Sequence, residues 1–484
     1  MKTTIAVLDK KGGNAASKTI KVLDALYLEK SACFQVMTPE AFAVALKKDL
    51  KSLHPRDLNS PNAIGLASTK DISDEETEII RKGEATLVFG GKVYSTTQEH
   101  VIEAFLKEKL QPDCIMYAEA FLDEREGDYT LVIVEAQKIV AARDPIGVMP
   151  LYFGENESVA ALASNRKALW KLGIAEPKSF PPGNIAEVSR EGFKFKPVKT
   201  LAYQEPKPIS LDDAAKTLQR LLESSVRKRV MGRKKVAVAF SGGLDSSLVA
   251  FLAKKCGVEV ELVHVSLENQ PETKEAKKAA EELQLPMQIH LFKEADVEKV
   301  ISEVVGLVEE PDPVKVSVGI PFYWTAQKTA KAGLKVLLAG QGADELFGGY
   351  QRYVNQYILE GDEKVRKTMF HDVSVIHESN IERDEKICGF HDVELRLPFA
   401  SFQIAEFAMS LPTELKIEKK ADSLRKLVLR KTAENIGLSK GIAEKPKKAV
   451  QYSTGINNAL KKLAKKHNLT LAEYVNRLFL EVKK

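Results

Sequence analysis

The segment 241–247 contains the residue types best suited to binding a phosphate. Its residues are Ser241, Gly242, Gly243, Leu244, Asp245, Ser246 and Ser247. Two glycines let the backbone approach a ligand closely, and three hydroxyls can donate hydrogen bonds to it. Asp245 is unfavourable in an anion site unless a divalent cation bridges its carboxylate to the phosphates, so the segment implies Mg²⁺. A strand-to-helix turn capped by serine is the simpler alternative, but such a turn does not require this combination of residues.

The pattern SGGxDS resembles the loop of the ATP pyrophosphatase (PP-loop) superfamily. Members of that superfamily cleave ATP between its α- and β-phosphates and form an adenylated intermediate. The resemblance therefore implies ATP and Mg²⁺ as cofactors, with residues 241–247 as phosphate ligands. No lysine precedes the last serine, which separates this segment from a Walker A loop. GMP synthetases, NAD synthetases, argininosuccinate synthetases and tRNA-modifying enzymes share the pattern, so it does not select one member.

A second glycine-rich segment, GQGADELFGGY at residues 340–350, adds a carboxylate at Asp344. It resembles the GxGxDExFGGY signature of asparagine synthetases and their β-lactam-forming relatives; an acidic turn is the alternative. The resemblance places Asp344 across from Asp245, so that both would hold the metal of a Mg²⁺–pyrophosphate. Asparagine synthetases typically carry glutamate at the second position, where this chain has Gln341. Glutamine forms hydrogen bonds but cannot act as a base, which leaves the acceptor and the acid/base step open.

Further segments follow in the order of the asparagine synthetase family. By resemblance, Val265 and Ser266 end a strand whose backbone would hold adenosine, and Gly340 completes the nucleotide site. The basic segment 445–449 resembles the one that carries the catalytic lysine of the family, with Lys447 as the best match. A cation there would stabilise charge that develops when the acyl-adenylate is attacked. A solvated surface lysine is the alternative at this position. Other matches are Glu310-Pro311-Asp312-Pro313, Arg383-Asp384 and Glu394-Leu395-Arg396-Leu397-Pro398-Phe399.

The N-terminal half resembles class II glutamine amidotransferase domains, in GDY at 127–129 and ARDPIGVMPLY at 142–152. Such enzymes use an N-terminal cysteine as nucleophile, activated by its own α-amine, but here the second residue is Lys2. Gly90 stands where the family has an oxyanion-hole asparagine, and the glutamine-binding HRG motif has only a faint match at residues 54–56. We therefore predict a glutaminase fold without glutamine hydrolysis. An unrelated α+β domain with accidental matches is the alternative.

Buried apolar runs precede both loops in the C-terminal half. KKVAVAF (234–240) leads into the first loop, and LKVLLAG (334–340) leads into the second. Amphipathic helical patterns alternate with these runs, which predicts a parallel sheet with helices on both faces. The resemblance makes this an adenine nucleotide α-hydrolase-like α/β fold. Ligands in such sheets bind beyond the carboxyl ends of the strands, where both loops lie. The segment 423–437 is predicted to be one helix.

The N-terminal half instead has short runs rich in Val, Ile and Thr, at 3–9, 86–94 and 129–144. They predict an α+β domain of mainly antiparallel strands, with a helix at 100–110. A proline-containing break at 202–210 separates the halves, and a helix capped by Ser210 follows it. The predicted domains are 1–205, glutaminase-like, and 206–484, synthetase-like.

The composition sets limits on the class of protein. The chain has 484 residues, 44% of them apolar and 29% charged, with a net charge of only +5. This balance allows an anionic ligand such as ATP but is no signature of a nucleic-acid binder. The basic run at 227–235 is expected to be a solvated helix end. The absence of a signal peptide, of a membrane span and of closely spaced cysteines predicts a cytoplasmic protein with reduced thiols.

These features together favour an ATP-dependent amidoligase that resembles asparagine synthetase. It would adenylate a carboxylate, with aspartate as the best candidate, and transfer ammonia to give an amide, AMP and pyrophosphate. Ammonia would come from solution or from a separate glutaminase. The possible partners are therefore a glutaminase subunit or a second copy of this chain in a homodimer. Two alternatives stay open: an enzyme that modifies a tRNA base or a specialised small molecule, and a regulatory protein that binds nucleotide without turnover.

Overall fold

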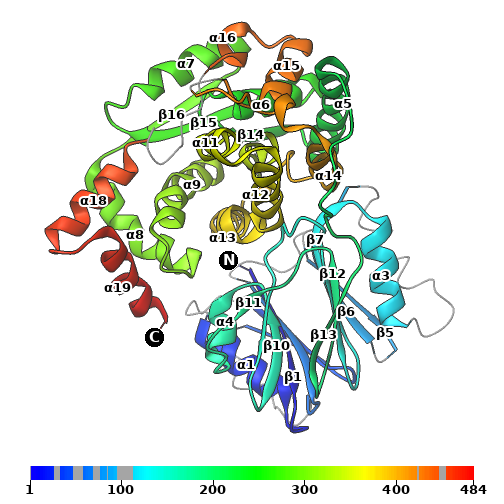
Figure 1. Cartoon of the computed structure of the whole chain (residues 1–484). Helices are drawn as coiled ribbons and strands as arrows, with labels where there is room; N and C mark the ends of the chain where they lie inside the picture. Colours follow the sequence, from blue (N-terminus) through cyan, green and yellow to red (C-terminus); the bar gives the residue numbers. More distant parts are fainter. Residues whose placement is uncertain are drawn as a thin grey trace. The chain divides into compact units, whose positions relative to one another are not determined.

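The computed structural model describes residues 2–26, 33–46, 58–68, 77–83, 85–94, 113–421, 424–445 and 454–483. The chain divides into two compact units, residues 1–200 and 201–482 (Figure 1). Among the described residues, none of the helices combines the length and apolar character that crossing a membrane requires. The helix predicted at 100–110 lies outside the described ranges.

Within the described ranges, the first unit contains a seven-stranded and a six-stranded sheet, and all strand pairs are antiparallel. The strand orders are β11-β9-β10-β1-β4-β2-β3 and β13-β12-β8-β7-β6-β5. The strands are β1 (Lys2–Asp9), β2 (Cys33–Met37), β3 (Phe42–Leu46), β4 (Asn62–Ser68), β5 (Thr77–Lys82), β6 (Ala85–Val93), β7 (Gly127–Val134), β8 (Ile139–Arg143), β9 (Tyr152–Glu155), β10 (Val159–Ala163), β11 (Lys178–Ser179), β12 (Asn184–Ser189) and β13 (Gly192–Pro197). The predicted antiparallel α+β class is confirmed.

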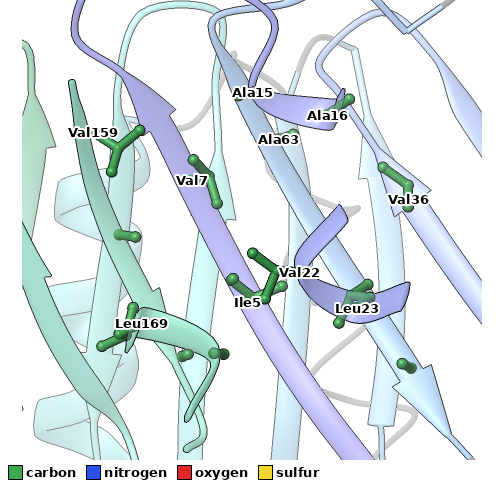
Figure 2. Packing of buried hydrophobic residues seen from close by; sticks show 14 of the residues in the cluster. Ile5, Val7, Ala15, Ala16, Val22, Leu23, Val36, Ala63, Val159 and Leu169 are labelled. Carbon is green, nitrogen blue, oxygen red and sulfur yellow. The ribbon is translucent and has the colours of Figure 1, made fainter. Parts of the chain in front are cut away.

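Strand β1 shows why the two sheets pack together. Its side chains alternate between two faces, as the two-residue period of a strand requires. Ile5 and Val7 point to helix α1 (Ala15–Leu26) and pack in one core with Val22 and Leu23 (Figure 2). Ala6 and Leu8 point the other way, into a second core shared with residues of the six-stranded sheet such as Val132.

The outer face of the six-stranded sheet is covered by α3 (Cys114–Glu124). Phe121 of this helix packs edge-on against Tyr129, with ring centroids 5.1 Å apart, and lies beside Phe89. The first unit is therefore built of four layers, helix, sheet, sheet and helix, each apolar face being buried against the next. The short helix α4 (Arg166–Lys171) packs with α1.

The second unit is built on one parallel sheet of five described strands, with order β16-β15-β14-β17-β18. These strands are β14 (Lys235–Ala239), β15 (Glu259–Leu267), β16 (Met287–Phe292), β17 (Val336–Leu338) and β18 (Glu394–Arg396). The predicted α/β class of this half is confirmed. The helices of the unit are α5 (Leu211–Val230), α6 (Leu244–Lys255), α7 (Glu272–Leu283), α8 (Glu294–Val308), α9 (Pro313–Lys331), α10 (Ala343–Phe347), α11 (Gln351–Glu360), α12 (Asp362–Ser374), α13 (Glu382–Phe390), α14 (Phe402–Ser410), α15 (Leu427–Asn435), α16 (Lys440–Ala443), α18 (Ile456–Lys466) and α19 (Leu471–Lys483).

The strand order reverses beside β14. The chain runs from β14 through α6 to β15 and through α7 to β16, always away from the same side of β14 (Figure 1). It then returns to place β17 on the other side. Since parallel crossovers are right-handed, α6 and α9 cover opposite faces of the sheet, and the carboxyl ends of β14 and β17 form its topological switch point, the place where such sheets bind ligands. The loops that follow these two strands are the two glycine-rich segments.

Two helix boundaries test the sequence pattern. Helix α5 begins at Leu211, and the hydroxyl of Ser210 accepts a hydrogen bond from the Asp213 N–H at 3.1 Å, as the break and cap predicted. The prediction of one helix at 423–437 is wrong in its first turn. Helix α15 begins at Leu427, because Lys426 has a φ of +63° and Arg425 forms an isolated bridge with Ile417.

The expectation that the basic run 227–235 is solvated is wrong for Arg229. Its side chain is 1% exposed, and its guanidinium donates to the Ser225 hydroxyl at 2.7 Å and to the Ala400 carbonyl at 3.2 Å. Arg233 and Lys235 pair with Glu394 and Glu261. The sequence did not predict the burial of this arginine, because a charged residue in a short basic run does not reveal the buried carbonyl to which it will donate.

Lys416 is a buried cation whose removal should stabilise the second unit. Its side chain is 4% exposed, and burial, with some help from Arg366, lowers its pKa from 10.5 to about 7. Lys416→Met is expected to raise the free energy of unfolding by roughly 2–5 kcal/mol at pH 7, because a lysine that is protonated in the unfolded wild type must on folding either bury its charge or lose its proton.

The pH dependence supplies the check on this prediction. Between pH 7 and 10.5 the unfolded lysine binds a proton that the folded one has lost, so wild-type stability gains on the variant as pH rises. Melting temperatures across that window should therefore converge, while the exposed Lys461→Met control shows no such trend. A constant difference at all pH values would contradict this explanation.

Candidate nucleotide-binding site

The first glycine-rich loop turns sharply after β14. Gly242 has a φ of +69°, and a Cβ atom there would lie 2.6 Å from the Cα of Ala276. Both constraints require glycine, because L side chains rarely adopt this φ and the backbone of α7 leaves no space. The Ser241 and Ser246 hydroxyls lie 3.2 Å apart, and the Gly243 N–H donates to the Ser241 Oγ at 3.3 Å. The loop is thus a closed turn lined by hydroxyl groups.

Helix α6 begins directly at this turn with Leu244. The first N–H groups of a helix have no intrahelical acceptor, and the helix dipole makes them a favourable place for an anion. The Ser247 side chain is fully buried, and its hydroxyl has no hydrogen-bond partner within the described part of the chain. A turn with free N–H groups and serine hydroxyls matches the donors that a phosphate chain requires.

The second loop comes into direct contact with the first. A Cβ atom at Gly340 would lie 2.9 Å from the Cβ of Asp245, so glycine allows the two loops to approach. Gly342, with a φ of +93°, then starts the short helix α10, which carries Asp344. A side chain at Gly349 would also collide with Asp344, since its Cβ would lie 1.9 Å from Oδ1. The glycines of this loop therefore make room for the carboxylates.

Asp245 and Asp344 share one cation, the ammonium of Lys426. Its Nζ lies 2.7 Å from both carboxylate oxygens of Asp245 and 2.7 Å from Oδ1 of Asp344. The lysine side chain is buried. Burial lowers the pKa of Lys426, but the two carboxylates outweigh burial and raise the pKa above its usual value. The two aspartates that were predicted to face each other thus bind the same ammonium group.

The two carboxylates suit a metal bound through a ligand rather than through protein alone. Among the described residues, no group of three or more His, Cys, Asp or Glu side chains could hold a metal ion. Asp245 and Asp344 supply two hard oxygen donors, and Mg²⁺ commonly takes one or two carboxylates and completes its shell with phosphate oxygens and water. The donor set therefore fits Mg²⁺ carried by a nucleotide.

Glu345 supports the second loop through hydrogen bonds to its carboxylate. Its carboxylate is buried and accepts hydrogen bonds from the Tyr350 hydroxyl at 2.5 Å and from the Asn380 amide at 2.8 Å. Burial, and then the nearby charge of Asp344, raise the pKa of Glu345. Its role is to fix the turn around Asp344, because both of its hydrogen bonds are to residues of the surrounding framework.

Val265 and Ser266 lie at the carboxyl end of β15, next to the first loop. Val265 is 6% exposed and Ser266 only 1%. Because both side chains are buried, a nucleoside would contact the backbone groups of these residues. The Ser266 hydroxyl lies 2.9 Å from the hydroxyl of Thr273. His264 ties the strands together here through the Phe240 carbonyl, 2.9 Å from Nδ1.

Two predicted residues remain, Lys447 and Gln341, and of these only Gln341 lies within the described residues. Lys447 lies in the segment 446–453, outside the described residues. Lys445, just before that segment, donates to the Gly242 carbonyl at 3.0 Å and pairs with Glu275 at 3.1 Å. Gln341 is described, and its side-chain Nε2 lies 2.5 Å from Oδ2 of Asp384. The basic segment thus begins on the first loop.

Sequence reasoning missed three residues at this site: Lys426, Lys445 as a contact of the loop, and Asp384 as the partner of Gln341. Lys426 is one of 72 basic residues, and the helical pattern around it suggested an ordinary helix position. Its positive φ and its two carboxylate partners arise from tertiary structure. Asp384 was noticed as part of a motif, but its contact with a loop 43 positions away was not foreseen.

The amidotransferase-like motif of the first unit has a structural role. Arg143 is fully buried and donates to the carbonyls of Met149, at 2.7 Å, and Gly147, at 2.7 Å. The Asp144 carboxylate accepts from three backbone N–H groups at 2.7–3.1 Å through one oxygen and from Met149 N–H through the other. These bonds fix the turn after β8. Lys2 is the first residue of β1, Gly90 lies in β6, and residues 54–56 lie outside the described ranges.

Together, an antiparallel four-layer unit and a parallel α/β unit with paired acidic and glycine-rich loops define a class of two-part proteins with an amidotransferase-like and a nucleotide-binding half. An asparagine synthase family model matches residues 217–364 and 355–481, and a glutamine amidotransferase domain model matches residues 69–171. The chain belongs to the asparagine synthetase family.

Individual relatives agree with this family assignment. A putative glutamine-hydrolysing asparagine synthetase of Methanocaldococcus jannaschii is 34% identical over 402 residues, which are 73% of this chain and 74% of the relative. The glutamine-hydrolysing asparagine synthetase of Asparagus officinalis is 30% identical over 372 residues, 72% of this chain but 62% of that protein. A solved glutamine phosphoribosylpyrophosphate amidotransferase from B. subtilis matches 60% of this chain and 80% of its own, at 14% identity and a TM-score of 0.31, which supports no argument.

Proposed function

We propose that this chain is an ATP-dependent amidoligase that adenylates a carboxylate, with aspartate as the best candidate, and transfers ammonia to it. The products would be an amide, AMP and pyrophosphate. One observation carries the proposal: Asp245 and Asp344, from loops at the ends of adjacent strands, meet at one cation at the switch point of the sheet. Simple nucleotide binding does not need two carboxylates at that place.

Each predicted residue except Gln341 has a part in this proposal. The turn 241–247 and the start of α6 would bind the phosphates, and Val265, Ser266 and Gly340 would line the nucleoside side. Asp245 and Asp344 would hold Mg²⁺, which when bound neutralises phosphate charge and activates the α-phosphate. Lys426 balances the two carboxylates and adds a positive charge beside the phosphates. Lys447 is proposed as the cation that stabilises the acyl-adenylate as it is attacked.

We propose ammonia as the nitrogen donor. The sequence of β1 (Lys2–Asp9) contains no cysteine, and Gly90 has no side chain to polarise a carbonyl. Both features favour a first unit that keeps the amidotransferase fold without its hydrolytic chemistry. These relatives are named as glutamine-hydrolysing enzymes, so the nitrogen source has to be measured for this chain.

The test is a pyrophosphate-release screen over amino-acid acceptors with Mg²⁺–ATP, with ammonium and glutamine supplied separately. We expect release with aspartate and ammonium, formation of asparagine, and little product with glutamine. Equal rates with glutamine would overturn the ammonia assignment and leave the ligase intact. Nucleotide binding without pyrophosphate release for any acceptor would favour a regulatory protein, while retention on an RNA column with strong salt dependence would favour a nucleic-acid acceptor.

A further inference from the structure

Gln341 and Asp384 form a contact that the proposed chemistry does not yet use. Gln341 lies on the loop between Gly340 and Asp344 and is partly exposed, whereas Asp384, in the first turn of α13, is fully buried. The amide Nε2 of Gln341 lies 2.5 Å from Oδ2 of Asp384. A buried acid thus reaches a side chain of the candidate site.

The orientation of the Gln341 amide follows from the partners of Asp384. Arg383 Nε donates to Oδ1 at 2.7 Å, and a terminal nitrogen of Arg383 donates to Oδ2 at 3.0 Å. Such two-point binding is the geometry of an ionised carboxylate, which only accepts hydrogen bonds. Burial raises the pKa of Asp384, and the Arg383 guanidinium opposes that shift. Gln341 must therefore turn its NH₂ group to Asp384 and its Oε1 away from it.

We propose that the buried Arg383–Asp384 pair positions the Gln341 amide so that Oε1 accepts an N–H of the attacking nitrogen nucleophile. This inference rests on the proposed function. Asparagine synthetases typically carry glutamate at this loop position, and a carboxylate there can take a proton. An amide oxygen offers a similar acceptor without a charge, and it needs a second group to keep it from rotating.

The lone pair of ammonia attacks the acyl carbon of the adenylate, the C–O bond to the phosphate breaks, and AMP leaves with the electron pair. The surplus proton on nitrogen passes to solvent water, because the neutral Gln341 oxygen cannot keep it. The nucleophile must therefore arrive as neutral ammonia. At fixed total ammonium, the rate should rise about tenfold per pH unit below the pKa of ammonium, since the neutral fraction does so.

The first experiment uses Gln341→Met in the full chain, because methionine is similar in size but offers no strong acceptor. Two reactions are measured: acceptor-dependent ATP–pyrophosphate exchange, and amide formation with ammonium. We expect the ratio of amide formation to exchange to fall by about tenfold to a hundredfold, the effect of one lost hydrogen bond to the nucleophile. The exposed Gln351→Met is the matched control and should keep the wild-type ratio.

The two reactions separate the two possible failures. Absence of exchange in the wild type would overturn the proposed function. Wild-type exchange combined with an unchanged ratio in Gln341→Met would overturn this inference alone. Gln341→Glu adds a pH readout, since a carboxylate there can bind ammonium and take one of its protons before the attack, so its rate should depend less steeply on pH than that of the wild type. Equal slopes would also count against the inference.

The role of Asp384 is tested by Asp384→Asn in two backgrounds. Asparagine keeps the size of the side chain but can donate as well as accept, so the Gln341 amide is free to turn. We expect the ratio to fall several-fold in the wild-type background and not to fall further in Gln341→Met, because coupled residues are non-additive. An equal fall in both backgrounds would mean that Asp384 acts through the fold and not through Gln341.

Discussion

Asp245→Asn and Asp344→Asn should each reduce acceptor-dependent ATP–pyrophosphate exchange by about a thousandfold, which corresponds to roughly 4 kcal/mol of transition-state stabilisation. Asparagine has nearly the same shape but lacks the charge that a divalent cation needs. Each aspartate also packs against a glycine, at Gly340 and Gly349, where the missing Cβ leaves room for it.

The same structure indicates that these variants should stay folded. Lys426 contacts both aspartates, so the loss of one carboxylate leaves its ammonium paired with the other. The matched control is Asp212→Asn on α5, whose carboxylate is exposed and 3.6 Å from Lys431. It should keep wild-type exchange. Wild-type exchange in Asp245→Asn would contradict the assignment of this carboxylate to the metal.

The fold could be predicted from the sequence wherever an element depends on a local pattern of residues. Apolar runs that end at glycine-rich segments predicted β14 and β17 and their loops, because a buried strand needs apolar residues on both faces. Ser210 predicted the start of α5 because an N-cap needs one hydroxyl and one N–H three residues later. The order of the five strands, by contrast, depends on contacts between distant residues, and no local pattern contained it.

The site was harder to predict where a charged side chain is buried. Lys426, Arg229 and Asp384 all come from stretches rich in charged residues, where a solvated side chain is the usual outcome. Each is buried because a specific partner compensates for lost hydration, and that partner is distant in sequence for Lys426 and Arg229. Glycines, serines and aspartates in a loop, by contrast, can be assigned from their own chemistry.

Lys426→Met is expected to show both the structural and the chemical role of this lysine. Methionine keeps much of the volume of the stem but removes the ammonium that the Asp245 and Asp344 carboxylates share. Removing one partner of a buried ion pair costs about 3–5 kcal/mol, so the melting temperature should fall by several degrees. Exchange should fall about a hundredfold or more, since the positive charge beside the phosphates is lost as well.

Two conditions should restore the stability of Lys426→Met but leave the wild type unchanged. Added Mg²⁺ can bind between the two carboxylates, and lower pH can protonate one of them, because the pKa of one of two neighbouring carboxylates rises once their shared ammonium is removed. In the wild type, the raised pKa of Lys426 keeps its contribution to stability at every pH below 10.5 and loses it only as pH rises through the higher folded value. Neither condition should therefore act through this lysine near neutrality.

Thermal melts with and without Mg²⁺, with the exposed Lys461→Met as control, test this directly. If Mg²⁺ raised the melting temperatures of both variants equally, the two carboxylates would not form a cation site.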